Sequence, residues 1–232
     1  MISRIIKSKM SIGFRRALRN LWTEHQIYRM HQKGKRQARK YAGQLELKLH
    51  VGCGDKIKAG WVNIDLHPSA NVSLDLRKPL PFGDGSSCVI YSEHFMEHLE
   101  HPDETIPFLR EAFRVLRSGG RFSVGVPDIE WPVRAYAGDP NCSGWFEYVM
   151  GVYPQSEWLQ TKADCVNYSF RQGTQHKYAW DFETMKRALQ IVGFADVKRR
   201  PFDPALDNEK SHYAFGPNMS KDTTLYVDAR KA

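Results

Sequence analysis

Short apolar runs alternate with polar turns over most of the chain, and two longer segments show a helical spacing of apolar positions. The short runs have the length and composition typical of β-strands and span residues 45–51, 61–66, 72–76, 88–92, 121–126, 195–200 and 223–229. The helical segments, 105–116 and 181–192, are followed by Gly119-Gly120 and by Gly193, which are typical helix terminators. Strands that alternate with helices predict an α/β fold with a mainly parallel sheet covered on both faces.

A glycine turn joins the first two strands, and the second strand ends in an acid. Gly52 and Gly54 let the backbone approach a nucleoside ligand closely, and Asp65 lies where ribose hydroxyls would be. The position three after Gly54 is Ile57 rather than glycine, and residues 52–60 are too few for a full crossover of about 10–12 residues. These departures weigh against a dinucleotide site, and so against an NAD-dependent oxidoreductase, although a nucleoside cofactor is still expected.

The first 40 residues form a strongly basic arm. They carry twelve Lys and Arg residues and one acid, Glu24, whereas the rest of the chain has 22 basic and 25 acidic residues. Helical spacing relates Phe14, Leu18, Leu21, Trp22, His25 and Tyr28. The pattern fits a helix packed on the body before a solvated basic stretch at 33–40, a peripheral contact with anionic membrane, or an organelle transit peptide. We expect deletion of residues 1–40 to weaken liposome binding without affecting cofactor binding.

Length and cysteine usage place further bounds on the protein. The 232 residues suit one α/β domain with appendages, which we expect as an arm at 1–44 and a domain at 45–232 with a helical, aromatic insertion at about 128–175. The four cysteines form no CxxC pair, which favours a reducing, cytoplasmic setting. No apolar run approaches the roughly 20 residues of a membrane span, so any membrane contact is expected to be peripheral, at the inner face.

Several motifs follow one another in an order known from one enzyme class. They are Val51-Gly52-Cys53-Gly54, Asn63-Ile64-Asp65, Leu80-Pro81-Phe82, residues 89–99 and residues 116–121. Together they resemble the motifs of class I S-adenosylmethionine (SAM)-dependent methyltransferases, and most closely the small bacterial type of surface-polysaccharide and glycolipid pathways. The resemblance covers roughly residues 45–230 and implies a Rossmann-like, mostly parallel seven-stranded sheet with helices on both faces and an antiparallel final strand. Two positions depart from it, His50 before the glycines and Ser118 in place of a usual proline.

The resemblance implies SAM as the cofactor and supplies a set of contact residues. The set is Gly52, Cys53, Gly54, Asp65, Leu66, Asp75, Leu76, Ser92 and Glu93. The glycine turn would contact the methionine end, Asp65 would accept hydrogen bonds from the ribose hydroxyls, and the segment at Asp75 would meet the adenine. A capping role in a loop is the alternative for either acid. No metal is expected.

Methyl transfer to a hydroxyl also needs a base. The candidate bases are His94, His98 and His176, since histidine titrates near neutrality. His94 and His176, with Glu93, are the residues expected in catalysis, because these positions lie on the acceptor side in the family, whereas His98 is expected to face a helix interior or a neighbour. Residues 94–98 also fit the HxxEH pattern of zinc peptidases, but the methyltransferase resemblance already accounts for them. Each histidine is also compatible with a purely structural hydrogen bond.

The segment 131–175 is rich in aromatic side chains. It contains Trp131, Tyr136, Trp145, Phe146, Tyr148, Tyr153, Trp158 and Tyr168. Such a segment suits a sugar-binding surface or a helical lid with its own core. The function expected from the whole pattern is SAM-dependent O-methylation of a glycan, glycolipid or related small-molecule hydroxyl. The alternative is a non-catalytic SAM- or nucleotide-binding module that docks a biosynthetic complex through its basic arm; nucleic-acid binding has no supporting motif.

Overall fold

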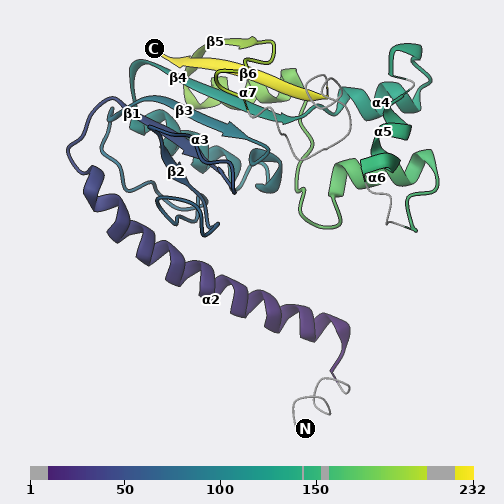
Figure 1. The fold of residues 1–232 in the computed structure, drawn as a ribbon, viewed down its shortest axis with the longest axis horizontal. Helices are drawn as coiled ribbons and strands as arrows, with labels where there is room; N and C mark the ends of the chain where they lie inside the picture. The colour runs from purple at the N-terminus through teal and green to yellow at the C-terminus, as the bar shows by residue number, and fades with distance from the viewer. Residues whose placement is uncertain (1–9, 143, 153–156, 208–222) are drawn as a thin grey trace.

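The computed structural model describes residues 10–142, 144–152, 157–207 and 223–232, and its centre is a single mixed sheet (Figure 1). The strands run in the order β2-β1-β3-β4-β6-β5. Their bounds are β1 Leu47–Val51, β2 Val62–Ile64, β3 Ser87–Glu93, β4 Leu116–Pro127, β5 Phe194–Arg199 and β6 Thr224–Lys231. The α-helices are α2 Ile12–Ala38, α3 Thr105–Val115, α4 Glu130–Tyr136, α5 Trp145–Val152, α6 Lys162–Arg171 and α7 Phe182–Val192. Short 3-10 turns are η1 Arg39–Tyr41, η2 Met96–His98 and η3 Pro140–Cys142.

The sheet has six strands among the described residues, whereas the sequence predicted seven. Strands β2, β1, β3 and β4 pair in parallel, and β6 pairs antiparallel with both β4 and β5, so the prediction of an antiparallel final strand is confirmed. The missing strand is the predicted one at residues 72–76, which forms only a single bridge between Ile64 and Val72. Its apolar side chains are buried as a loop instead, which explains the strand-like pattern.

Helices α3 and α7 pack side by side on one face of the sheet, where Figure 1 shows them behind the strands. Phe122 of β4 contacts Phe108 of α3 and Phe194 of β5 in the fully buried centre of this layer. The terminator prediction for α3 was wrong, because the helix ends at Val115 and the glycine pair lies inside β4. The prediction for α7 is confirmed, since Gly193 caps it in the left-handed conformation.

The other face of the sheet is covered by loops in the described residues, where the sequence predicted helices. Lys58, from the loop between β1 and β2, lies over the Tyr91 ring, and Arg200 lies over the Tyr226 ring. Arg200 also forms ion pairs with Asp207 and Asp228 of 2.5 and 3.0 Å. The β1–β2 crossover is too short for a helix, and the cationic side chains of Lys58 and Arg200 pack on this face instead.

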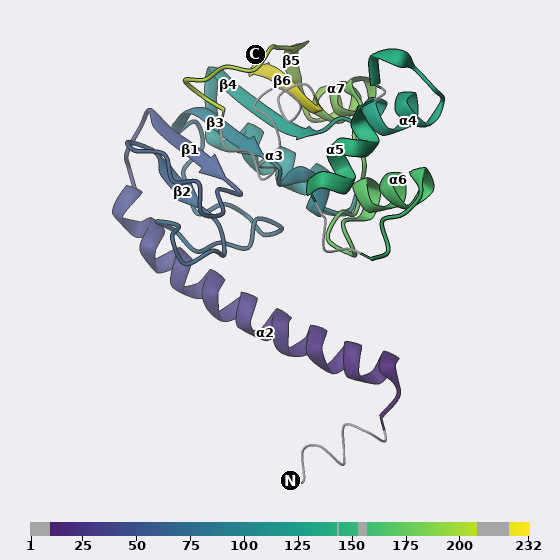
Figure 2. The same ribbon diagram turned by 45° about the vertical axis from the view of Figure 1, so that its right-hand side comes forward.

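Two segments extend from the sheet. The segment between β4 and α7 folds into α4, α5 and α6, which share a second apolar cluster built on Trp145, Phe146 and Cys165. Helix α2 projects from the β2 edge (Figures 1 and 2), and contacts the body through its second half, where Gly34 and Ala38 are buried. The apolar residues Phe14, Leu18, Leu21, Trp22 and Tyr28 are exposed, so the first of the three interpretations, packing of this stripe on the body, is wrong. In the described part of the chain, α2 and the other helices are too short or too polar to cross a membrane.

Candidate functional site

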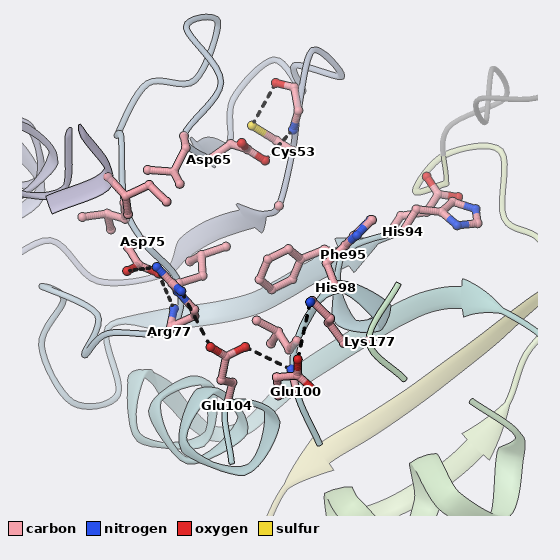
Figure 3. Close-up of a pocket in the computed structure, with 18 of the residues that line it drawn as sticks. Cys53, Asp65, Asp75, Arg77, His94, Phe95, His98, Glu100, Glu104 and Lys177 are labelled. Atoms are coloured by element: carbon pink, nitrogen blue, oxygen red, sulfur yellow. Dashed lines mark hydrogen bonds and ion pairs between the residues drawn. The ribbon is translucent and has the colours of Figure 1, made fainter. Parts of the chain in front are cut away.

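A cavity of about 670 Å³, here called the large cavity, opens at the carboxyl ends of β1, β2 and β3 (Figure 3). Parallel strands end at the same edge of the sheet, so the segments that follow them meet there. The turn after β1, the acid after β2 and the residues after β3 all line the space. Helix α2 and residues 74–77 close the opposite side.

The large cavity collects most of the residues that the sequence predicted as cofactor contacts. Its lining includes Gly52, Cys53, Gly54, Asp65, Leu66, Asp75, Leu76 and Glu93. Ser92 differs, because it is fully buried within β3 and does not line the space. The roles of the individual residues remain predictions, but eight of the nine share one cavity although they are spread along more than 40 positions of sequence.

The glycine turn is tightly built and is tied to Asp65. Gly52 has φ +67, and a Cβ there would collide with the side chain of Phe95. The backbone N–H of Gly54 donates to one Asp65 carboxylate oxygen at 2.9 Å, and that of His67 donates to the other at 2.8 Å. The carboxylate therefore fixes the turn from within the protein and keeps further lone pairs for ribose hydroxyls.

Asp75 begins a chain of charged contacts that leads through Arg77 to Glu24 of α2, along one side of the large cavity. Its buried carboxylate accepts hydrogen bonds from Arg77, and Arg77 donates in turn to both carboxylate oxygens of Glu24 at 3.1 and 2.9 Å. Burial opposes ionisation of Asp75, but the Arg77 contacts outweigh it and hold the carboxyl pKa below its usual range. Asn20 and Ile27 of α2 also line the large cavity. We therefore no longer expect that removing the arm would leave cofactor binding intact.

The charge of the large cavity suits a cationic ligand. Its lining has six carboxylates, from Glu24, Asp65, Asp75, Glu93, Glu100 and Glu104, and three cationic side chains, from Lys56, Arg77 and Lys177. SAM carries a sulfonium cation, which a surplus of acids stabilises. Figure 3 shows Asp75, Arg77 and Glu104 along one side, with Asp65 and Cys53 on another.

Burial favours the neutral forms of His50, which precedes the glycine turn, and Cys53, which lies within it. It lowers the pKa of His50 to about 4, and raises that of the Cys53 thiol to about 12 with help from the nearby Asp65 charge. Only a thiolate is a good nucleophile. Burial and the Asp65 charge therefore favour the thiol form of Cys53 over the thiolate.

A second space of about 80 Å³, here called the small cavity, lies between the sheet edge and the helical insertion. Aromatic side chains from the insertion and the following loop line it, together with hydrogen-bonding groups. The aromatic lining is Trp145, Tyr148, Tyr168, Phe170 and Tyr178, and the polar lining includes Asp128, Gln172, His176 and Thr224. His94 lines both cavities, so the two spaces meet at this side chain.

His94 is held in an unusual backbone conformation between two partners. Its φ of +52 lies in the left-handed region, and its N–H donates to the Gly125 carbonyl at 2.9 Å. The ring lies between Glu97, with Nδ1 and Oε1 3.4 Å apart, and Thr224, with Nε2 and Oγ1 3.4 Å apart. The helical HxxEH arrangement does not form, because His94 precedes a 3-10 turn.

Glu97 brings three histidines together. Burial opposes charge on both members of the His94–Glu97 pair, but their hydrogen bond and mutual attraction outweigh it, which raises the pKa of His94 and lowers that of Glu97. His98 and His176 lie on the other side of Glu97, with ring centroids 5.1 Å apart. Burial lowers the pKa of His176, although Glu97 and a hydrogen bond to Ser169 oppose this.

Several residues that line the two cavities were not among those predicted from the sequence. Glu97 was noticed only as the acid of the HxxEH pattern. Asp128 directly follows β4 as Asp65 directly follows β2, which was a usable signal. The contribution of α2 through Asn20, Glu24 and Ile27 had no local signal, because it depends on where the arm lies. Tyr153 lies outside the described residues.

Comparison with known proteins identifies the domain. Residues 49–124, about a third of the chain, match the family model described as a methyltransferase domain. A search among curated proteins finds no matching relative. This segment carries β1 to β4 and most of the large cavity.

Many solved structures resemble the chain at low identity. A SAM-dependent methyltransferase from Archaeoglobus fulgidus is 16% identical, with 85% of this chain and 92% of that chain covered and a TM-score of 0.46. One from Mesorhizobium loti is 16% identical, with 81% and 91% covered and a TM-score of 0.46. The phosphoethanolamine N-methyltransferase 2 of Haemonchus contortus, in complex with SAM, is 13% identical, with 81% and 49% covered and a TM-score of 0.45. Identities of this size leave the substrate open.

The domain match falls on the segment that forms the turn, the acid after β2 and the acidic cavity. This match supports an enzyme over the alternative of a non-catalytic docking module. The match makes residues 49–124 a methyltransferase domain, so the protein is an enzyme and its cofactor is SAM.

Proposed function

We propose that the enzyme transfers the methyl group of SAM to a hydroxyl of a glycan, a glycolipid or a related small molecule. The observation that carries this proposal is the position of His94, which lines both the large cavity and the small cavity. SAM in the large cavity and an acceptor in the small cavity would meet at this ring. The aromatic and polar lining of the small cavity suits a sugar, whose faces are apolar and whose rim carries hydroxyls.

Alignment is the main contribution expected from the protein, since SAM brings its own leaving group. Holding the methyl group and the acceptor oxygen in line can supply about 7–11 kcal/mol of the barrier. In our proposal His94 removes the hydroxyl proton, with Glu97 fixing the ring through Nδ1. Glu93 accepts a hydrogen bond from the Tyr226 hydroxyl at 2.9 Å, which orients its carboxylate at the edge of the large cavity.

The gain of one methyl group by an acceptor tests this proposal. Purified enzyme and SAM carrying an isotopically labelled methyl group are incubated with hydroxyl-bearing glycans and glycolipids, and with matched acceptors that carry an amine. Mass spectrometry should find one labelled methyl ether on a sugar hydroxyl. Labelling that occurs only on nitrogen would contradict O-methylation and leave the methyltransferase assignment standing.

We also propose that the enzyme works at an anionic membrane surface, which would bring it to a glycolipid acceptor. At about 100° per residue, Phe14, Leu18, Leu21, Trp22 and Tyr28 fall within an arc of about 120° on α2. All five are between 46% and 70% exposed. The face that contacts the body and lines the large cavity lies roughly opposite, so the stripe points away from the protein.

The basic residues of α2 favour anionic lipid as the surface that this apolar stripe contacts. Arg15, Arg19 and Lys33 border it along one side, and Glu24 is the only acid among the first 40 residues. A basic, amphipathic helix of this kind lies in the headgroup region of anionic lipid, where each nearby cation adds about 1 kcal/mol. Because the same helix forms a wall of the large cavity, membrane contact would place the active site near the lipid surface.

A further inference from the structure

Three side chains from two separate segments converge beside the small cavity. They are Glu97 and His98, from η2, and His176, from the loop after α6. Each offers one ligand atom, and these atoms lie within 4.8 Å of one another. No local pattern groups the three residues, because His176 is almost 80 positions from Glu97 and His98. Glu97 and His176 line the small cavity, and His98 lines the large one, so the cluster forms part of the wall between the two.

The backbone fixes both imidazole rings in the orientation that metal ligands need. The Nδ1 atom of His98 lies 3.1 Å from the carbonyl oxygen of Gln175, and Nδ1 of His176 lies 2.9 Å from that of Ser169. A carbonyl oxygen only accepts, so each Nδ1 carries the proton and each Nε2 presents a lone pair. Metal-bound histidines almost always donate their other N–H to such a partner.

The carboxylate has one oxygen to spare. Oε1 of Glu97 faces His94, whereas Oε2 is buried and has no hydrogen-bond partner among the described residues. The side chain is only 3% exposed. A buried carboxylate oxygen without a partner is costly, and a cation satisfies it directly.

We propose that Glu97, His98 and His176 bind a divalent first-row transition metal ion, most suitably Zn²⁺. Two imidazoles and one carboxylate form an open zinc site, with a fourth position left for water or substrate. Zinc ligands lie about 2.0–2.2 Å from the ion, so ligand atoms that share it are about 3–3.5 Å apart. The ligand atoms lie up to 4.8 Å apart in this structure, so the three groups approach one another by up to about 1.5 Å when the ion binds.

The position of the metal site relates it to the proposed methyl transfer. Its open position would face the small cavity, since two of the three ligands line that space. In so far as the proposed O-methylation holds, a cation there would polarise an acceptor hydroxyl held next to His94. The metal site itself does not depend on that function, because binding is measured without substrate.

Zinc retention by the full-length chain tests the proposal. Protein freed of metal with a chelator is loaded with Zn²⁺ and passed through gel filtration, and zinc is counted by elemental analysis. We expect one ion per chain. Glu97→Gln and His176→Gln should each weaken Zn²⁺ binding at least about tenfold, while His67→Gln, which changes a histidine outside the cluster, should match the parent.

SAM binding by the same variants guards against a folding defect. Glu97 and His176 do not line the large cavity, so calorimetry should find SAM affinity within a few-fold of the parent. Zinc retention equal to the parent in both variants would overturn the site, as would a parent that binds no zinc while it binds SAM. The cluster would then be a proton-sharing network around Glu97. Loss of zinc together with intact SAM binding supports the site even if no methyl acceptor is found.

Discussion

At the scale of single residues, Gly52 sets the geometry of the cofactor turn. Its φ of +67 and the collision of any Cβ with Phe95 both exclude a side chain. We expect Gly52→Ala to weaken SAM binding at least about tenfold, because left-handed strain alone costs about 1–2 kcal/mol. Calorimetric titration measures this. Gly83→Ala, in a loop where a Cβ meets nothing within 4 Å, is the control, and equal affinities in the two variants would contradict the account.

His94 makes a second residue-scale prediction, about rate rather than cofactor affinity. Replacing it with glutamine keeps a hydrogen-bonding side chain but removes the base, so kcat for hydroxyl methylation should fall by about 10²–10⁴-fold. KM for SAM should change much less, since His94 is one of many lining residues. Steady-state kinetics separates the two constants. A variant with unchanged kcat would show that the ring only supports the structure.

The positions of site residues could be predicted where they directly follow a strand that the apolar pattern predicts. Gly52, Gly54 and Asp65 follow strands that the apolar pattern marks, so their meeting at one sheet edge was predictable. Ser92 shows the limit, since the alternation that places Glu93 at the cavity buries its neighbour in β3. The Glu97–His98–His176 cluster was beyond prediction, because it depends on how the insertion returns to the sheet.

At the scale of elements, the contact of α2 with the body depends on Gly34. A Cβ there would collide with the Ser73 carbonyl, so we expect Gly34→Ala to push the helix away and lower the free energy of unfolding by about 1–3 kcal/mol. SAM affinity should fall as well, since α2 lines the large cavity. Denaturant unfolding and calorimetry measure both effects.

Gly13→Ala is the matched control in the same helix, because its Cβ would meet nothing within 4 Å. Its effect on stability should stay within about 0.5 kcal/mol. Gly34→Ala with parental stability and SAM affinity would contradict the placement of α2.

Elements were predictable where one face is clearly buried. The helices α3 and α7 and the strands β1, β3, β5 and β6 were predicted within about two residues of their bounds, whereas β4 begins at Leu116, before the predicted start at residue 121. Residues 72–76 misled, because a buried loop and a strand share the same apolar composition. The apolar stripe on α2 was correctly predicted as helical, but it is exposed instead of packed on the body. Amphipathic spacing predicts a helix but not which surface covers its apolar face.

At the scale of the whole molecule, the exposed stripe predicts membrane attachment. Leu21 and Trp22 are 70% and 64% exposed, and burial of such side chains is worth about 1.5–3 kcal/mol each. The double variant L21S/W22S should therefore bind anionic vesicles at least about tenfold more weakly in a flotation assay, with SAM affinity unchanged. I191S, which alters an apolar residue exposed on α7, is the control. The membrane proposal would be contradicted if the double variant bound anionic vesicles as tightly as the parent, or if the parent bound uncharged and anionic vesicles equally.

Calorimetric titration of SAM into the full-length protein measures whether the large cavity holds the cofactor. We expect one SAM per chain, competition by the demethylated product, no binding of NAD, and loss of affinity in Gly52→Ala but not in Gly83→Ala. A folded protein that binds neither SAM nor its demethylated product, or that binds SAM equally well in both glycine variants, would contradict the assignment of the large cavity.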